Sequence, residues 1–202
     1  MKPNDTNIPV IETHPLEPFL PEGARILMSG SFPPPRARWC MDFYYPNRQN
    51  DMWRIWAYIA TGNKDAFMLP DGKTFDKEKI IDFCQRIGLA LTDTGEQIVR
   101  ERGNASDAHL KVVKPRDFGA LLDRIPLCHD IALTGEKAVD TLGATLGFDK
   151  IEVGGYIETE HYGRHLRIWR MPSSSRAFPR SIEWKADYYR RLLDVATASA
   201  PM

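Results

Sequence analysis

The sequence predicts an α/β protein, a three-layer α/β/α sandwich with a central, mostly parallel, four-stranded sheet. Short apolar runs alternate along the chain with segments of helical periodicity. This alternation is typical of βαβ crossovers, which build a parallel sheet with helices on both faces. The chain has 202 residues, 43% of them hydrophobic, which suits one domain with one sizeable core.

Four apolar runs are the predicted strands. The first is a short apolar run that follows one glycine and precedes another, which indicates a buried central strand. The fourth is the return arm of a hairpin that begins near Ile151 and turns at "YGRH". In chain order, the strands are expected at residues 25–29, 89–94, 130–135 and 166–172.

Apolar residues at helical spacing predict helices between these strands. The helix after the first strand carries Trp53 and Trp56 on one face, so we expect both side chains in the core. The polar stretch 95–113 is expected to form a short helix followed by a loop around Ser106 and Asp107. Helices are predicted at residues 51–60, 76–88, 114–126, 136–147 and 180–198.

The first residues of the chain differ in composition from the rest. Residues 1–23 are rich in proline and show no period, so we expect an extended arm laid over a single domain formed by residues 24–202. The arm is too rich in proline and acidic residues for a signal peptide, and no apolar run is long enough to cross a membrane. We therefore expect a cytoplasmic monomer with no membrane partner.

Charge and cysteine content restrict the possible classes. The 27 Lys and Arg residues balance 27 Asp and Glu residues, which argues against a protein that grips nucleic acid by bulk charge. Between Arg164 and Arg191, basic residues outnumber acidic ones, which predicts either a focused basic face or an ordinary solvated surface. The scattered Cys40, Cys84 and Cys128 suit a reducing compartment, and we expect them to be small buried apolar residues.

Several common functional motifs are absent. The sequence has no dinucleotide-binding glycine pattern, no P-loop, no nucleophile elbow and no HExxH. His161 and His165 have a spacing that suits a metal only on a helix, and they lie in the predicted hairpin. We expect neither a metal nor another cofactor.

Two loops that follow predicted strands have an unusual composition. In "SGSFPPP" the prolines fix φ and hold the backbone rigidly. The segment "FYYPNRQN" then places aromatic rings beside amide side chains. Such rings stack on a flat heterocycle, and the amides form hydrogen bonds with its edge. "MPSSSR" offers hydroxyls, backbone N–H groups and a cation to a phosphate. Because parallel sheets bind ligands at the carboxyl ends of their strands, these loops predict a pocket for a base above a seat for its backbone.

Each loop also has a plainer interpretation. Asn47 or Asn50 would cap the helix that begins near Asp51. Tyr44 and Tyr45 would be half-buried packing residues, and the serines would form turns. The residues alone leave both interpretations open.

Taken in order, the segments "GSFP", "FYYPNRQNDMW", "LALTDT", a loop with "SD", "ALTG" and "MPSSSRAFP" form a series. This series resembles the uracil-DNA glycosylase superfamily, and most closely its hypoxanthine-DNA glycosylase and mismatch-specific uracil-DNA glycosylase branches. The resemblance covers residues 24–193. It implies an α/β/α domain that extracts a damaged base from DNA and hydrolyses its N-glycosidic bond.

The resemblance implies roles for particular residues. Asn50 would be the catalytic residue and Tyr45 would stack on the extruded base. Phe32 stands where many members carry a polar residue that activates water, so the chemistry would depend on Asn50. Asp51 is an ionisable alternative, but neighbours on a helix point about 100° apart, so both are not expected to face one pocket.

The same resemblance assigns the binding residues. The loop after the fourth strand would enter the minor groove, with Arg176 or Phe178 as the wedge. Substrate-binding residues are expected at Gly30, Ser31, Phe32, Pro33 and Tyr45, and DNA-binding residues at Ser173, Ser174, Ser175 and Arg176.

The expected function is therefore that of a monofunctional DNA glycosylase that acts on DNA containing a deaminated base, uracil or hypoxanthine. The amide of Asn50 is neutral, so such an enzyme would need a good leaving group. Two alternatives stay open: a member of the superfamily that has lost catalysis and binds nucleic acid or nucleotides, and a small-molecule hydrolase that uses one of the serines. Three scattered cysteines cannot supply the four ligands of an iron–sulfur cluster.

Overall fold

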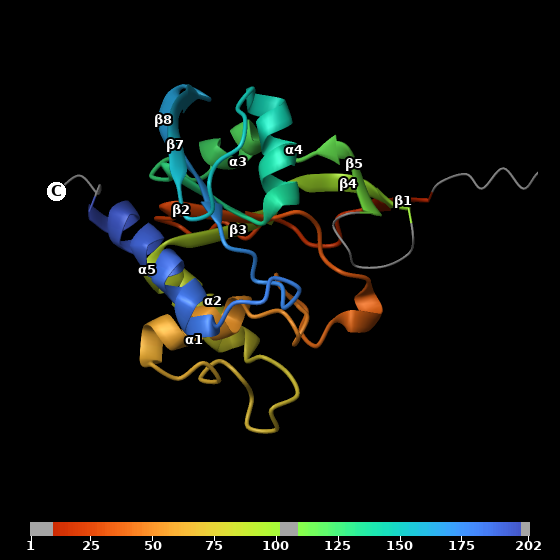
Figure 1. The fold of residues 1–202 in the computed structure, drawn as a ribbon, viewed down its shortest axis with the longest axis vertical. Helices are drawn as coiled ribbons and strands as arrows, with labels where there is room; N and C mark the ends of the chain where they lie inside the picture. The colour runs from red at the N-terminus through yellow and green to blue at the C-terminus, as the bar shows by residue number, and fades with distance from the viewer. Residues whose placement is uncertain (1–9, 102–108, 199–202) are drawn as a thin grey trace, which may run out of the picture.

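The computed structural model describes residues 10–101 and 109–198. Their fold is of the mixed α/β class, with a central sheet flanked by helices on both faces, as Figure 1 shows. The predicted class and layers are therefore confirmed, but the predicted number of strands is wrong.

The central sheet has five strands, whereas the sequence predicts four. Four strands are parallel and match the four predicted ones, and the fifth is the outgoing arm of the hairpin, which pairs antiparallel with the return arm. The outgoing arm alternates exposed and half-buried residues and has no apolar run, so its place at the sheet edge left no strong signal in the sequence. The spatial order is β3 (Leu89–Asp93), β2 (Ile26–Gly30), β6 (Asp130–Thr134), β8 (Arg164–Met171) and β7 (Tyr156–His161).

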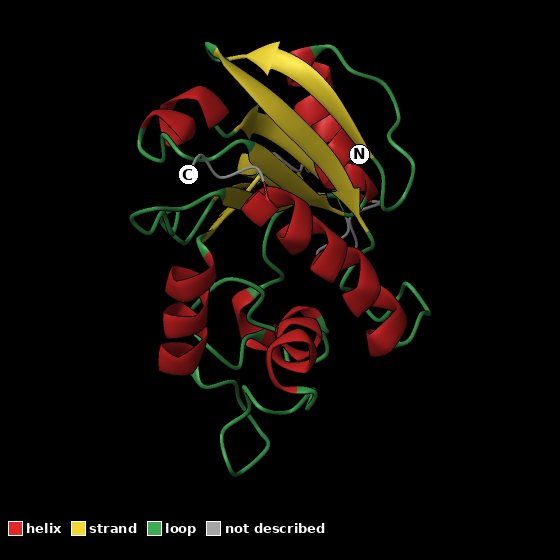
Figure 2. Cartoon of the chain, turned by 90° about the vertical axis from the view of Figure 1, so that its left-hand side faces the viewer, coloured by secondary structure: helices red, strands yellow, loops and turns green. Residues whose placement is uncertain are grey.

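Side chains from each central strand supply both hydrophobic cores. In β2, Ile26 and Met28 face one layer and Leu27 faces the other, because side chains alternate across a strand. The first layer holds α1, α2 and α5, and the second holds α3 and α4; Figures 1 and 2 show the two groups on opposite sides of the strands. Among the described helices, none combines the length and the apolar character that a membrane span requires. The helices are α1 (Met52–Thr61), α2 (Lys77–Ile87), α3 (Phe118–Asp123), α4 (Glu136–Leu146) and α5 (Ile182–Ala198), with a short 3₁₀ helix at Arg36–Arg38.

Helix α1 is fixed to the aromatic loop that precedes it. Trp53 and Trp56 are fully buried, as their spacing predicts. The ring N–H of Trp53 donates to the carbonyl of Tyr44 at 2.9 Å. The start of α1 is therefore bonded directly to the loop before it.

A second, smaller sheet replaces the predicted short helix. Its strands are antiparallel in the order β1 (Ile11–Thr13), β4 (Gly95–Arg100) and β5 (Leu110–Pro115). The prediction of a helix after residue 94 is wrong because β4 pairs with a segment more than 80 residues earlier, and local sequence carries no trace of that pairing. The predicted loop around Ser106 and Asp107 lies outside the described residues.

The segment 10–23 packs along the edge of the domain. Besides the pairing of β1 with β4, the backbones of Phe19 and Leu91 exchange two hydrogen bonds, of 3.0 and 2.8 Å. These bonds occupy the free edge of β3 at that point. The division into an arm and one domain stays a prediction, but its described part contacts both sheets.

All three cysteines are free thiols. Cys84 and Cys128 are buried and Cys40 is half-buried. Burial raises the pKa of the Cys128 thiol to about 12 and that of Cys84 further, so both stay protonated at neutral pH. The expectation of small buried residues is confirmed for these two.

Asp130 joins the first residue of β6 to the middle of β8, and its removal should destabilise the fold. The residue is 1% exposed, and its carboxylate accepts hydrogen bonds from Arg167 Nε and Nη2 at 2.7 and 2.6 Å and from Trp169 Nε1 at 2.8 Å. We expect Asp130→Ala to lower the free energy of unfolding by about 3 kcal/mol, because it removes the acceptor of three N–H groups. Urea denaturation measures this change.

The matched control is Asp82→Ala, which breaks an exposed pair with Arg86 on α2. This change should cost no more than about 0.5 kcal/mol. Equal urea midpoints for the two variants would contradict a structural role for Asp130.

Candidate functional site

A pocket of about 650 Å³ opens at the carboxyl ends of the parallel strands. Because β2, β3, β6 and β8 run in the same direction, their last residues meet at one edge of the sheet. The structure brings every residue of the predicted site into the wall of this pocket, together with the second wedge candidate, Phe178. The predicted residues are Gly30, Ser31, Phe32, Pro33, Tyr45, Asn50, Ser173, Ser174, Ser175 and Arg176.

The floor of the pocket lies where β2 and β3 end side by side. Gly30 is paired with Asp93, and a Cβ atom on Gly30 would lie 2.5 Å from Asp93 Oδ1. Atoms do not pack that closely, so glycine at this position leaves the room that the carboxylate occupies. The Tyr45 hydroxyl is 3.6 Å from the same point. Asp93 and Tyr45 therefore converge above Gly30.

The proline-rich loop forms one wall. The Arg100 guanidinium donates to the carbonyl of Pro33 and lies 5.5 Å from the centre of the Phe32 ring. Phe32 also meets the His14 ring edge-on, with 5.1 Å between ring centroids. Contacts from two other segments thus add to the fixed φ of the prolines in holding this wall.

Tyr45 is half-buried and is held in an unusual conformation. Its φ of 51° is in the left-handed region, which residues other than glycine rarely adopt. Its hydroxyl lies 3.0 Å from Thr134 Oγ1, and its ring meets Trp53 edge-on. Burial holds the pKa of Tyr45 well above its usual value, so the side chain stays a neutral phenol. The packing interpretation fits Tyr44, which is 2% exposed, better than it fits Tyr45.

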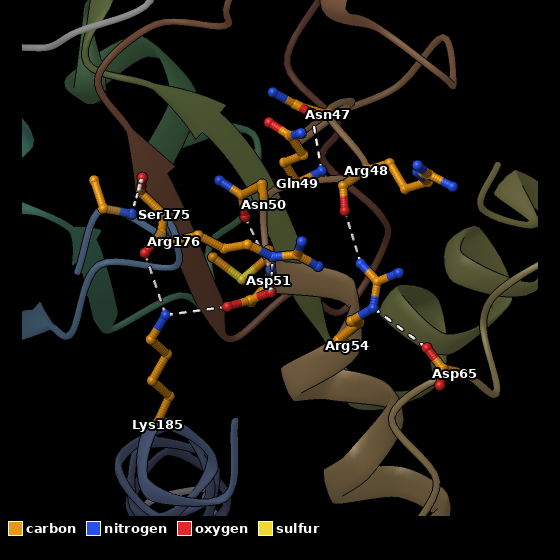
Figure 3. A network of polar contacts seen from close by, with 12 residues as sticks. Asn47, Arg48, Gln49, Asn50, Asp51, Arg54, Asp65, Ser175, Arg176 and Lys185 are labelled. Atoms are coloured by element: carbon orange, nitrogen blue, oxygen red, sulfur yellow. Dashed lines mark hydrogen bonds and ion pairs between the residues drawn. The ribbon is translucent and has the colours of Figure 1, made fainter. Parts of the chain in front are cut away.

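Asn50 lies on the pocket wall at the start of α1. Its Oδ1 accepts a hydrogen bond from the backbone N–H of Met52, the first residue of α1, at 2.9 Å. The N-cap of α1 is Asp51, so the interpretation of Asn47 or Asn50 as the N-cap is wrong, and Asn50 instead forms a turn just before the helix. Figure 3 shows the amide nitrogen on the side away from that bond, and within the described ranges the structure gives Nδ2 no hydrogen-bond partner. The turn leaves the nitrogen and one lone pair of Oδ1 available, and the catalytic role stays a prediction.

The serine loop is joined directly to the loop that carries Asn50. The backbones of Asn50 and Ser175 pair as an isolated antiparallel bridge, and the Asp51 N–H donates to the carbonyl of Ser174 at 2.9 Å. Within the loop, the Ser173 and Ser175 hydroxyls accept from backbone N–H groups two residues later, as the turn interpretation predicts. The two loops therefore form one continuous rim.

Behind this rim, Asp51 is buried and bound to two cations, as Figure 3 shows. Arg176 Nε lies 3.0 Å from Oδ1, and Lys185 Nζ lies 3.3 Å from Oδ2. Lys185 is fully buried and also donates to the Ser175 carbonyl at 3.2 Å. Asp51 does not line the pocket, which fits the expectation that it and Asn50 face different ways.

Sequence reasoning missed the roles of three residues. Lys185 shares a face of α5 with Tyr189 and Leu192, both fully buried, and a lysine among apolar residues at helical spacing was the available signal. Asp93 is 6% exposed and lines the pocket, and its signal was a carboxylate at the end of a buried strand. His14, whose Nε2 lies 2.8 Å from Asp93 Oδ2, gave no signal, since it belongs to a segment without periodicity.

Several basic residues near the carboxyl end of the chain bind other groups of the protein. Arg164 donates to backbone carbonyls around the end of α3, Arg167 binds Asp130, and Arg190 pairs with Asp187 on α5. These contacts favour the interpretation of an ordinary surface over a focused basic face.

The two hairpin histidines do not form a metal site in the structure. His165 is exposed and lies 2.8 Å from Glu160. Across residues 10–101 and 109–198, no group of three or more His, Cys, Asp or Glu residues is placed to hold a metal ion.

Fold and site together describe an α/β protein whose strand-end pocket has aromatic walls and a polar floor. No model of a known protein family and no curated protein matches the chain. Among solved structures, it is similar to a solution NMR structure from Methanosarcina acetivorans named as a "putative Uracil DNA glycosylase", with 23% identity and a TM-score of 0.56. The match covers 91% of this chain and 99% of that chain. At this identity, the similarity shows a shared fold.

Removing Lys185 tests whether it holds the two loops together. We expect Lys185→Met to lower the free energy of unfolding by about 3 kcal/mol, because it leaves a buried carboxylate with one cation and removes one of the two donors to the Ser175 carbonyl, the other being Phe178 N–H. Urea denaturation measures the change. Arg190→Met, on the exposed side of the same helix, should cost less than about 0.5 kcal/mol.

A double variant separates charge from packing. If Lys185 acts through Asp51, then Asp51→Asn combined with Lys185→Met should be more stable than the sum of the single changes predicts. Strict additivity would show that the two side chains do not interact.

Proposed function

We propose that this protein is a DNA glycosylase that hydrolyses the N-glycosidic bond of a deaminated base, uracil or hypoxanthine, in DNA. The observation that carries the proposal is the single strand-end pocket in which the aromatic loop and the serine loop meet. The proposal also draws support from the fold shared with the Methanosarcina acetivorans protein and from the resemblance of the motif series.

The pocket suits a flat heterocycle. Its volume of about 650 Å³ exceeds the needs of one base, and its walls carry the rings of Tyr45 and Phe32 beside rigid prolines. Extruding a base from DNA costs a few kcal/mol, and stacking on an aromatic ring recovers about 1–3 kcal/mol. Tyr45 is held in position for this, because its hydroxyl contacts Thr134 and its ring packs edge-on with Trp53.

The proposed chemistry uses Asn50 to orient a water molecule. As the bond between C1′ and the base nitrogen breaks, its electron pair leaves with the base and the sugar becomes oxocarbenium-like. Water adds to C1′ and loses a proton, and the departing base gains one. A neutral amide does not act as a strong base, so Asn50 would position the water or donate to the base, and a stable leaving anion would supply the driving force.

The serine loop would bind the DNA backbone beside the extruded base. Its hydroxyls and N–H groups suit phosphate oxygens, and the Arg176 side chain is 53% exposed, with only Nε bound to Asp51. Arg176 and Phe178 both remain candidates for the wedge. The proposed partner is thus DNA with a deaminated base, while the monomeric state and cytoplasmic location stay predictions.

One observation favours a second candidate, a catalytically inactive protein that binds nucleic acid or nucleotides. Phe32 packs against His14 and Arg100, so no polar side chain occupies the position where many relatives of the resembled family activate water. Such a protein would bind DNA with a steep salt dependence and leave the base in place.

Incubation with DNA duplexes that contain uracil, hypoxanthine or xanthine tests the proposal. Cleavage of the resulting abasic sites by alkali should reveal product for at least one base. Absence of product with all three would overturn the enzymatic proposal, and salt-dependent binding without product would select the inactive alternative.

The variant Asn50→Ala tests the assigned catalytic residue. We expect its single-turnover rate to fall by about 100-fold, because a group that orients water or stabilises the leaving base is lost. The variant also loses the hydrogen bond from Met52 N–H, which costs about 1 kcal/mol of stability. Asn63→Ala is the control, because Asn63 Oδ1 makes a similar turn to Asp65 N–H and does not line the pocket. An undiminished rate in Asn50→Ala would remove Asn50 from the mechanism.

A further inference from the structure

Among the described residues, two cations line the pocket, and each belongs to a different loop. Arg38 is in the loop that follows β2, Arg176 is in the serine loop that follows β8, and both are exposed. The carboxylate of the pocket wall, Asp93, is 6% exposed and lies on the floor. Positive charge is therefore found where the pocket opens to solvent.

The two loops lie on different sides of the opening. In the central sheet, β6 separates β2 from β8. The loop after β2 continues beside β4, because the Ser31 carbonyl accepts from Gly95 N–H and the Pro33 carbonyl accepts from Arg100. The serine loop starts from β8, on the other side of β6. A nucleotide that enters between the loops would therefore have one arginine on either side.

The Arg38 guanidinium is not engaged by the protein, unlike that of its neighbour Arg36. Arg36 Nη1 lies 2.9 Å from Asp42 Oδ1, and its guanidinium lies 4.2 Å from the centre of the Trp39 ring. Within the described residues, the structure gives the side chain of Arg38 no such partner. Arg38 therefore keeps its five N–H donors for a ligand.

The backbone that carries Arg38 is fixed before any ligand binds. Its N–H donates to the Pro35 carbonyl at 2.9 Å, and the N–H of Trp39 donates to the Arg36 carbonyl at 3.0 Å. The ring N–H of Trp39 also donates to the Pro34 carbonyl at 2.7 Å. Only the arginine side chain is left to be ordered on binding, which limits the entropy cost.

A guanidinium in this position suits a phosphodiester. Its planar fork matches two phosphate oxygens, and charge-assisted hydrogen bonds of this kind are stronger than neutral ones. The 27 Lys and Arg residues of the chain balance 27 Asp and Glu residues, so a few placed cations must attract a polyanion in place of bulk charge. A nucleotide whose base enters the pocket has a phosphate on each side of its sugar.

We infer that Arg38 binds the DNA phosphate on the side of the extruded nucleotide opposite to that held by the serine loop. This rests on the proposed function, since it takes the ligand to be a nucleotide within a DNA strand. Arg38 and Arg176 hold the strand on both sides of the sugar and so oppose the return of the base to the stack. Arg38 does not distinguish one base from another, because phosphate contacts carry no sequence information.

The salt dependence of DNA binding tests the inference without catalysis. The probe is a duplex with a tetrahydrofuran abasic site, which has no base to excise, and fluorescence anisotropy measures the Kd of the full chain between about 50 and 200 mM salt. Arg38→Met should raise Kd about tenfold at the lowest salt, because a charge-assisted hydrogen bond is lost. It should also reduce the slope of log affinity against log salt by about 0.9, the value for one phosphate contact.

The matched control is Arg36→Met. It removes the same charge two residues earlier on the same 3₁₀ helix, but Arg36 is paired with Asp42 and does not line the pocket. Its Kd should stay within about twofold of the wild-type value, with the same slope. Arg38→Lys keeps the charge and loses the planar fork, so it should keep the slope and recover only part of the affinity.

Neutral phosphates identify the contact that Arg38 makes. A methylphosphonate replaces one phosphodiester at a time on each side of the abasic site, and the loss of affinity is compared between the wild-type protein and each variant. One replacement should weaken binding by the wild-type protein and have little effect on Arg38→Met. Arg176→Met should show the same insensitivity at a phosphate on the other side of the site.

Several outcomes would overturn the inference. They are a wild-type protein that does not bind the duplex, a wild-type slope in Arg38→Met, equal effects of Arg38→Met and Arg36→Met, and one shared phosphate for both pocket arginines. If the protein excises a deaminated base while Arg38→Met binds DNA normally, the inference is wrong and the proposed function stands. Binding that depends on Arg38, without excision from any duplex, would sustain the inference and remove the proposed function.

Discussion

The buried carboxylate of Asp51 is the contact on which the architecture of the pocket depends. Loops that follow strands lack the regular backbone hydrogen bonds of a sheet. Here two such loops, far apart in the sequence, must meet. Asp51 binds Lys185 from α5 and Arg176 from the serine loop, while its own N–H donates to Ser174. Asp51 and Lys185 are withdrawn from water and tolerate few other arrangements, so their ion pair restricts the geometry of the rim.

The proposed catalytic residue, the neutral Asn50, is thereby positioned by a charged neighbour. Asn50 precedes Asp51 in the chain and lines the pocket, whereas Asp51 does not, and Asn50 Oδ1 accepts from the backbone N–H of Met52 at the start of α1. Because its backbone is bridged to Ser175 and its side chain makes this bond, Asn50 has little conformational freedom left to lose when a ligand binds. In the proposed reaction, this preorganisation would offset part of the weakness of an amide as a base and would favour substrates with good leaving groups.

Local patterns in the sequence predicted the helices and the four parallel strands, because burial on one or both faces leaves a period that can be read. The pairing of β1 with β4 could not be predicted, since it joins distant segments and β4 reads as polar and irregular. The site likewise has a part that the sequence predicts and a part that it does not. Motif order predicted that Tyr45 and Asn50 lie in one pocket, and both line it. The contact between His14 and Asp93 is created by packing of the first segment, and no local feature of that segment marks it.

Phe32 is a hydrophobic residue at a position where many members of the resembled family carry a polar one. In the structure its ring forms one side of the enclosure around His14, with Tyr44 on another and Arg100 against its face. Among the described residues that line the pocket, Asp93 is the one carboxylate. Phe32 therefore supplies enclosure and no charge, because its ring covers one side of the histidine that binds Asp93.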